Sequence, residues 1–309
     1  MKILAVVGAT ATGKTALALD LAATFGGEIV SCDSTAVYRG IDIGTDKPAR
    51  ADRRGIPHHL LDVADPHEVY SAARYAREAA AAIRDIDRRG RRVILAGGTG
   101  FYYRALVRGL FPGPERDDAL RARLDRVAER RGVEALHRWL ARVDPDSARR
   151  IQPRDRKRLV RALEVYLLTR RPLSAHFADT ASPIAGADVL PIGLVLPRPA
   201  LRERVAARVD AQFARGVLEE VDRLIAAGVP ASAHAFSGLV YRQIMEMRAG
   251  VRGRTATRDL IVQENMRYAR RQLIWFRQEA GVQWLHGPGE SPSIREQARG
   301  LARAFLGVE

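Results

Sequence analysis

Residues 8–15 constrain the fold of this chain more than any other segment. They read GATATGKT and match the pattern G-x-x-x-x-G-K-[ST], in which a glycine-rich turn directs backbone N–H groups at a phosphate. An apolar run at 3–7, typical of a buried strand, precedes the motif, and a helical pattern at 16–25 follows it. Strand, loop and helix in this order predict a phosphate group held at the amino end of the helix.

The same loop indicates a diphosphate site. Lys14 adds a positive charge to the backbone donors, and the hydroxyl of Thr15 is placed to ligate Mg²⁺. The motif does not determine which ligand binds, because ATP, GTP and an isoprenoid diphosphate present the same two phosphates. We expect the diphosphate to contact the whole loop, namely Gly8, Ala9, Thr10, Ala11, Thr12, Gly13, Lys14 and Thr15.

Strands alternate with helices in most of the remaining chain. We expect strands at 28–32, 92–96 and 189–196, a helix at 69–89, and helices only from Pro199 onward. Pro191 suggests that the last strand lies at an edge of the sheet or that this residue stands at its beginning. The pattern predicts an α/β fold with a parallel, helix-covered sheet of the P-loop type.

A helical insertion interrupts this pattern. Residues 111–114 read FPGP, a cluster that breaks helices and strands, and 116–170 show helical periodicity without a convincing strand. Residues 181–191 are again rich in turn-forming residues. We therefore divide the chain into a catalytic core, 1–113 with 187–309, and a helical insertion at 114–186.

Charge and cysteine content narrow the function. The net charge is +15, and residues 115–171 and 242–277 carry 13 of the excess positive charges, a concentration that codon usage alone would not produce. Such stretches attract polyanions, although a charge that serves solubility is the alternative. The single cysteine, Cys32, excludes a disulfide framework and a cysteine-rich zinc site. With no signal peptide and no apolar run long enough for a membrane span, we expect a cytoplasmic protein that does not contact membranes.

Two polar residues follow predicted strands at the edge where ligands bind in such sheets. Asp33 can bind metal, accept a proton or cap a turn, and Thr99 can line the crevice while capping the following helix. His58 and His59 point in different directions as adjacent residues, and no cluster of Asp, Glu or Cys accompanies them, so core or loop histidines are the better interpretation.

Basic residues recur at helical spacing in both charged stretches. Arg267, Arg270 and Arg271 share one face of a predicted helix, while Tyr268 and Trp275 lie on another. A stripe of like charges destabilises a helix, which favours a polyanionic partner over a merely solvated face, although neither interpretation is excluded. The first stripe, in the insertion, consists of Arg154, Lys157, Arg158 and Arg161.

The motifs together resemble the tRNA dimethylallyltransferase family, also called tRNA isopentenyltransferase. The resemblance covers nearly the whole chain and is of the bacterial type, since no zinc-finger extension of the eukaryotic kind follows the core. The motifs that carry it are GATATGKT (8–15), DSTAVYRGIDIGTDKP (33–48), IPHHLLDV (56–63), GGTGFYYRAL (97–106), RLVRALEVY (158–166) and RYARRQLIWFR (267–277).

The resemblance implies a reaction and assigns residues to it. Family members transfer a dimethylallyl group from dimethylallyl diphosphate to N6 of the adenosine directly 3′ of the anticodon, with Mg²⁺ and no organic cofactor. Asp33 matches the catalytic aspartate, with Lys14, Thr15 and Thr99 beside it, and Arg208 matches an arginine near the diphosphate. The anticodon stem-loop of tRNA would contact Asp33, Ser34, Thr35, Ala36, Thr99, Arg121, Lys157, Arg158, Leu159, Val160 and Arg161.

The chain departs from the family pattern at three positions, and three competing functions stay open. Many relatives have Gln at the positions of Ala36 and Lys157, and Gly at that of Val240. An enzyme that prenylates free adenylate would share the loop and Asp33 but would not need the basic insertion. A P-loop kinase of a small metabolite would share the loop, and a non-catalytic RNA-binding protein would explain the charge. We expect the enzyme to act as a monomer.

Overall fold

The computed structural model describes residues 1–308, which form two compact units. One unit contains Met1–Val107 together with the chain from Pro183 onward, and the other contains Arg108–Ser182. The sequence placed the boundaries at 113/114 and 186/187. Both boundaries lie earlier in the structure, at 107/108 and 182/183. At the first of them, Phe111 packs inside the second unit, with its ring 5.6 Å from His176 and 5.8 Å from Phe177.

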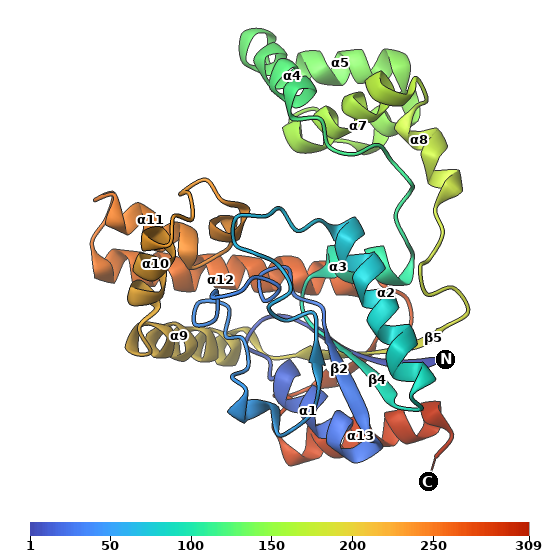
Figure 1. The fold of residues 1–309 in the computed structure, drawn as a ribbon, viewed down its shortest axis with the longest axis vertical. Helices are drawn as coiled ribbons and strands as arrows, with labels where there is room; N and C mark the ends of the chain where they lie inside the picture. Colours follow the sequence, from blue (N-terminus) through green and yellow to red (C-terminus); the bar gives the residue numbers. More distant parts are fainter. Residues whose placement is uncertain (309) are drawn as a thin grey trace. The chain divides into compact units, whose positions relative to one another are not determined.

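The larger unit is built on a six-stranded sheet in the order β3-β2-β4-β1-β5-β6, in which every pair of neighbours is parallel. The predicted α/β class is confirmed. Since all strands run the same way, their carboxyl ends meet along one edge (Figure 1). The strands are β1 (Lys2–Gly8), β2 (Gly27–Ser31), β3 (His58–His59), β4 (Arg92–Ala96), β5 (Asp188–Val195) and β6 (Gln283–His286).

Helices cover both faces of the sheet, and β1 shows why its sequence is continuously apolar. Ile3 belongs to the buried cluster that also contains residues of α2, α3 and α12. Leu4, its neighbour, belongs to the cluster formed with α1 and α13. A strand buried on both faces needs apolar side chains at every position. The helices of this unit are α1 (Lys14–Phe25), α2 (Ala72–Arg88), α3 (Gly100–Val107), α9 (Arg198–Ala214), α10 (Val217–Ala226), α11 (Tyr241–Arg248), α12 (Arg254–Arg277) and α13 (Pro292–Leu306), with the 3-10 turns η1 (Ala51–Arg53) and η3 (His234–Ser237).

Two expectations about the carboxyl-terminal half need correction. The chain after Pro199 is not entirely helical, because Gln283–His286 forms β6, a strand too short to show a clear alternation in the sequence. β5 does not lie at the edge either, since β6 pairs beside it. The pairing with β6 begins only at Ile192, one residue after Pro191, while Pro191 itself lies opposite Ala5 of β1.

The smaller unit is helical, as the periodicity predicted. Its core contains Leu136, Leu140, Leu159 and Leu163, which are fully buried. The two ends of the unit meet in a single antiparallel bridge between Leu110 and Ala181. The helices are α4 (Asp118–Arg131), α5 (Val133–Val143), α6 (Pro145–Arg150), α7 (Arg156–Thr169) and α8 (Leu173–His176), followed by the 3-10 turn η2 (Phe177–Asp179).

No helix within residues 1–308 combines the length and the apolar character of a membrane span.

Candidate active site

A cavity of about 920 Å³ lies where the carboxyl ends of β1, β2 and β4 meet. Residues of the phosphate loop form one side of it, including Lys14 and Thr15. Asp33, which follows β2, lines the same cavity. The structure therefore brings together the loop and the carboxylate that the sequence placed in one crevice.

The loop of residues 8–13 keeps its shape through two glycines and an internal hydrogen bond. Gly8 has φ of +129°, and a Cβ atom there would lie only 2.8 Å from the carbonyl oxygen of Leu194. Gly13, with φ of +88°, ends the loop where α1 begins. Between them, Thr12 Oγ1 donates to the carbonyl oxygen of Ala9 at 2.8 Å. This curled backbone is the form that presents N–H donors to a phosphate.

Lys14 is held over the loop and has an unusually low pKa. Its Nζ donates to the carbonyl oxygen of Ala9 at 2.6 Å. Burial, together with the positive charge of Arg208, lowers the pKa of Lys14 to about 8, while the negative charge of Asp33 acts in the opposite direction. An anion bound in the loop would stabilise the ammonium form of this side chain.

Arg208 reaches the loop from α9, as the resemblance implied. Its Nη1 donates to Thr10 Oγ1 at 2.6 Å, and its Nε is hydrogen-bonded to Asp46. Asp46 also accepts from Gln212 Nε2 at 2.6 Å and pairs with Arg215. The position of Arg208 thus depends on a carboxylate that the sequence analysis did not single out.

The segment that carries Asp46 is fixed by a buried acid. Glu220 of α10 is almost fully buried, and its carboxylate accepts the backbone N–H groups of Asp42 at 3.0 Å and Ile43 at 2.8 Å. The hydroxyl of Tyr241 donates to the same carboxylate at 2.5 Å. Nothing local in the sequence around Glu220 indicates this role, because every partner except Tyr241 lies far upstream in the chain.

Asp33 uses one carboxylate oxygen to cap a turn. Oδ1 accepts from the backbone N–H of Thr35 at 2.8 Å, from Thr35 Oγ1 at 2.7 Å and from the N–H of Ala36 at 3.3 Å. Within residues 1–308, hydrogen bonds reach Oδ1 but not Oδ2. Asp33 can therefore cap the turn and still take part in chemistry, because Oδ2 remains available to a group in the cavity.

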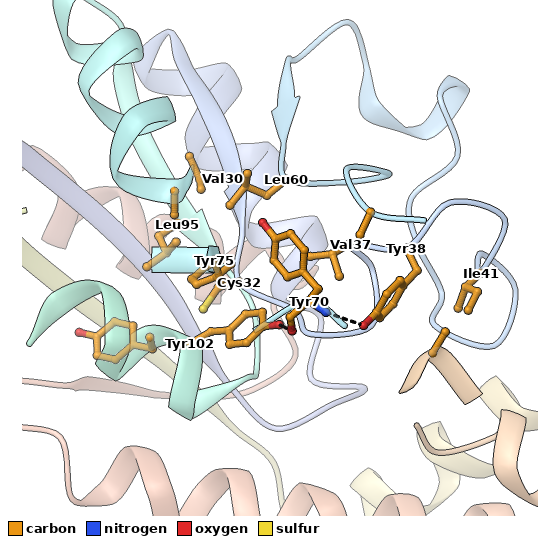
Figure 2. Close-up of a cluster of buried hydrophobic side chains, with 14 of the residues drawn as sticks. Val30, Cys32, Val37, Tyr38, Ile41, Leu60, Tyr70, Tyr75, Leu95 and Tyr102 are labelled. Atoms are coloured by element: carbon orange, nitrogen blue, oxygen red, sulfur yellow. Dashed lines mark hydrogen bonds between the residues drawn. The ribbon is translucent and has the colours of Figure 1, made fainter. Parts of the chain in front are cut away.

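A buried cluster rich in aromatic side chains contains Cys32, the residue directly before Asp33 (Figure 2). Cys32 belongs to the cluster, and burial raises the pKa of its thiol to about 12, so it does not act as a nucleophile. The rings of Tyr75 and Tyr102 stack with centroids 4.2 Å apart. The hydroxyl of Tyr38 accepts from the N–H of Tyr70 at 3.2 Å. The residue directly before Asp33 is therefore anchored in a packed hydrophobic core.

Thr99 is not among the residues that line the cavity, but it holds one of them in place. Its Oγ1 accepts from the N–H of Ser34 at 3.0 Å, and its own N–H donates to the carbonyl oxygen of Cys32 at 3.2 Å. Ser34, in turn, lines the cavity. The hydroxyl thus holds the turn after β2 against the segment after β4, although α3 begins directly after Thr99.

Gln272 of α12 is a further site residue that the sequence analysis missed. Its Oε1 accepts from the N–H of Thr10 at 2.8 Å, and its Nε2 donates to the carbonyl oxygen of Gly98 at 2.9 Å. One buried side chain therefore ties the phosphate loop to the segment after β4. The only signal in the sequence that could have indicated Gln272 is that a polar residue stands on the face of the predicted helix that points to the protein interior.

Val240 also lines the cavity and adopts a backbone conformation that suits glycine. Its φ is +79° and its ψ is −62°, a strained conformation for a β-branched residue. The N–H of Val240 donates to Gln243 Oε1 at 2.8 Å as α11 begins. This hydrogen bond holds the turn at the amino end of α11.

In the helical unit, the candidate tRNA contacts separate into exposed and internal residues. Lys157 and Arg158 are exposed on α7, whereas Leu159 and Val160 are buried in the core. The side chains of Leu159 and Val160 cannot form a contact surface, so the expectation that the whole segment 157–161 contacts RNA needs correction.

Arg121 and Arg161 are engaged inside the same unit. Both pair with Glu164, at 2.8 Å and 2.6 Å, and Glu164 is fully buried. Although burial opposes it, hydrogen bonds from Arg121 and Arg161 lower the pKa of this carboxyl to about 2. Because removal of one partner would leave a buried charge uncompensated, these arginines have a structural role.

The fold and the loop define a P-loop phosphate-binding protein, and comparison with known proteins gives its family. The family model described as IPP transferase matches residues 36–279. The chain is 46% identical over 305 residues to the tRNA dimethylallyltransferase of Geobacter metallireducens, covering 97% of each chain. It is 47% identical over 310 residues to that of Solibacter usitatus, covering 99% of this chain and 100% of the relative.

The solved tRNA isopentenylpyrophosphate transferase of Bacillus halodurans has a TM-score of 0.73 and 34% identity, covering 99% of this chain and 97% of that one. The chain belongs to the tRNA dimethylallyltransferase family.

The low pKa of Lys14 predicts that diphosphate binding depends on pH. The ammonium loses its proton as the pH rises through about 8, so inorganic diphosphate should bind most tightly below pH 8. Above the pKa, the affinity of the wild type should fall by up to about tenfold per pH unit relative to Lys14→Arg, which keeps its charge. Isothermal titration calorimetry of both proteins measures this difference, and parallel pH profiles would contradict it.

Proposed function

We propose that this enzyme transfers a dimethylallyl group from dimethylallyl diphosphate to N6 of the adenosine directly 3′ of the anticodon in tRNA. The observation that carries the mechanism is the shared cavity, in which the phosphate loop and Asp33 face the same space. The loop receives the leaving group, and the carboxylate engages the incoming amine. We further propose that the enzyme acts in the cytoplasm as a monomer.

Asp33 activates the adenine amine. The lone pair of an exocyclic amine is conjugated with the ring, so the amine is a weak nucleophile. Oδ2 of Asp33 accepts a hydrogen bond or a proton from N6 while N6 attacks C1 of the dimethylallyl group. The new N–C bond forms, the C–O bond to diphosphate breaks, and N6 loses one proton. A positioned base of this kind contributes about 10²–10⁴ in rate.

The loop, Lys14 and Arg208 stabilise the departing diphosphate. Negative charge grows on its oxygens as the C–O bond breaks, and the donors of the loop, Lys14 and Arg208 would stabilise that charge. Mg²⁺ would fit beside Thr15, whose exposed hydroxyl lines the cavity and supplies the hard oxygen ligand that this ion prefers. When bound, Mg²⁺ supplies further neutralisation of the diphosphate charge.

The target adenosine reaches the cavity only after leaving its stack. Enzymes that modify a base in this way act most readily on unpaired nucleotides, and the anticodon loop offers them. Ser34, Thr35 and Ala36, on the turn after Asp33, surround the entering base, and Thr99 holds this turn in place. Lys157 and Arg158 of the helical unit contact the RNA backbone.

Two other activities remain as comparisons for the experiment. A prenyltransferase that acts on free adenylate would use the same loop and Asp33, but it would not need the basic helices of Arg108–Ser182. A small-metabolite kinase would require further metal ligands and arginines around a γ-phosphate. Within residues 1–308 there is no group of three or more His, Cys, Asp or Glu side chains that could hold a metal.

The proposed function is tested by mass spectrometry of the product. Purified enzyme, dimethylallyl diphosphate and Mg²⁺ are incubated with an anticodon stem-loop RNA and, separately, with AMP. We expect the mass of one dimethylallyl group to be added to the adenosine 3′ of the anticodon and little addition to AMP. Preference for AMP would support the adenylate enzyme instead, and turnover of ATP with no prenyl transfer would support a kinase.

Replacement of Asp33 should affect catalysis more than binding. Asp33→Asn keeps an oxygen that can cap the turn but removes the base, so kcat should fall by about 10²–10⁴ while the affinity for tRNA changes less than about threefold. Single-turnover kinetics and filter binding measure the two quantities. Equal losses of kcat and affinity would show that Asp33 has no role as a base.

The two arginines of α7 should differ in their response to salt. Arg158→Ala removes an exposed charge and should reduce the salt dependence of tRNA binding by about one counterion. Arg161→Ala removes a partner of buried Glu164 and should mainly lower the melting temperature. Binding at several salt concentrations and thermal unfolding measure both variants. An unchanged salt slope for Arg158→Ala would exclude a phosphate contact at that residue.

A further inference from the structure

Phe101 is an exposed aromatic residue close in the chain to the residues that line the cavity. It lies in the first turn of α3, three residues after Gly98, which lines the cavity. The side chain is 49% exposed, although neighbouring residues of the same helix, Tyr102 and Tyr103, are buried. Burial of apolar area cannot account for a phenylalanine at this position.

Trp275 of α12 holds the ring of Phe101 in place. The two rings lie 6.5 Å apart at 78°, so one ring meets the other edge-on and Phe101 keeps an exposed surface. The guanidinium of Arg104 stacks on the indole of Trp275 at 4.4 Å and pairs with Glu279 at 3.0 Å. Since α3 and α12 pack against each other (Figure 1), this small assembly has a rigid base.

The same face of α12 forms part of the cavity wall. Tyr268, Arg271 and Gln272 line the cavity, and Trp275 follows them at helical spacing on that face. Trp275, with Phe101 against it, therefore lies on the face of α12 that also lines the cavity. On the same helix, Arg270 and Arg271 are exposed, and the guanidinium of Arg271 lies over the ring of Tyr268 at 5.6 Å.

We propose that Phe101 is a stacking platform for an unpaired tRNA base that neighbours the target adenosine. This inference rests on the proposed function and specifies how the RNA is positioned. Extrusion of one base leaves its neighbours without a stacking partner, and aromatic rings are the protein surface that replaces such a partner. Arg270 and Arg271 bind the adjoining phosphates, because their exposed positive charges complement those of RNA. Phe101 acts as a positioning residue and does not touch the reacting atoms.

Substitutions of Phe101 test whether its aromatic face is required. Stacking on an aromatic side chain contributes about 1–3 kcal/mol per base, so Phe101→Ala should raise KM for a stem-loop RNA by about tenfold. Phe101→Leu, which keeps apolar volume but lacks a π face, should show the same loss, while Phe101→Trp should retain the wild-type KM. The KM for dimethylallyl diphosphate should not change. Ile225→Ala, on α10 with a similar exposure of 42%, is the matched control and should be neutral.

A double-mutant cycle identifies the base. Stem-loops with an abasic site on the 5′ or the 3′ side of the target adenosine are compared with the intact RNA, using wild type and Phe101→Ala. At one of the two positions, removal of the base should raise KM of the wild type for the RNA about tenfold. The same removal should leave KM of Phe101→Ala almost unchanged. Additive losses at both positions, or wild-type kinetics for Phe101→Leu, would overturn the proposal. Failure of the wild type to prenylate any stem-loop would refute the proposed function instead, and thermal unfolding checks that each variant is folded.

Discussion

Parallel pairing of β1, β2 and β4 brings the ends of three strands to one edge of the sheet, and every part of the site depends on that edge. The loop after β1 supplies N–H donors, the turn after β2 supplies Asp33, and the segment after β4 supplies Thr99. Side chains from elsewhere then fix the spacing of these segments. Gln272 connects the first to the third, and Thr99 connects the third to the second. The loop, the turn with Asp33 and the segment with Thr99 are thus held together by contacts within the protein itself.

The site also balances charges before a substrate enters. Lys14 and Arg208 both point at the phosphate loop, and their mutual repulsion contributes to the lowered pKa of Lys14. Asp46 pairs with Arg208, while Asp33 offsets part of the charge on Lys14. A diphosphate would be attracted by such a cluster, because its negative charge relieves the repulsion between Lys14 and Arg208. Without Asp46, the guanidinium would lack the partner that aims it at Thr10.

Local patterns revealed the loop, the α/β class and Asp33, since each of them is encoded by a short run of neighbouring residues. The residues that position them could not be found in this way. Glu220 and Gln272 act on segments that lie far upstream in the chain, and only the folded structure brings them close. For the same reason, the segment 157–161 of α7 was expected to contact tRNA over its whole length. The helical spacing showed the stripe of positive charge but not that Leu159 faces the core. β6 was missed because it is short and its partner β5 aligns it.

The bridge between Leu110 and Ala181 has a consequence for the order of folding. β5 must pair with β1 in the middle of the sheet, yet the whole of Arg108–Ser182 separates it from α3. The inserted helices bury a core of their own, and the bridge closes their two ends onto each other. Once that unit has formed, the chain entering β5 behaves as a short connection rather than a long one. The entropy of loop closure, which grows with the length of unstructured chain, is then largely removed before the sheet is completed.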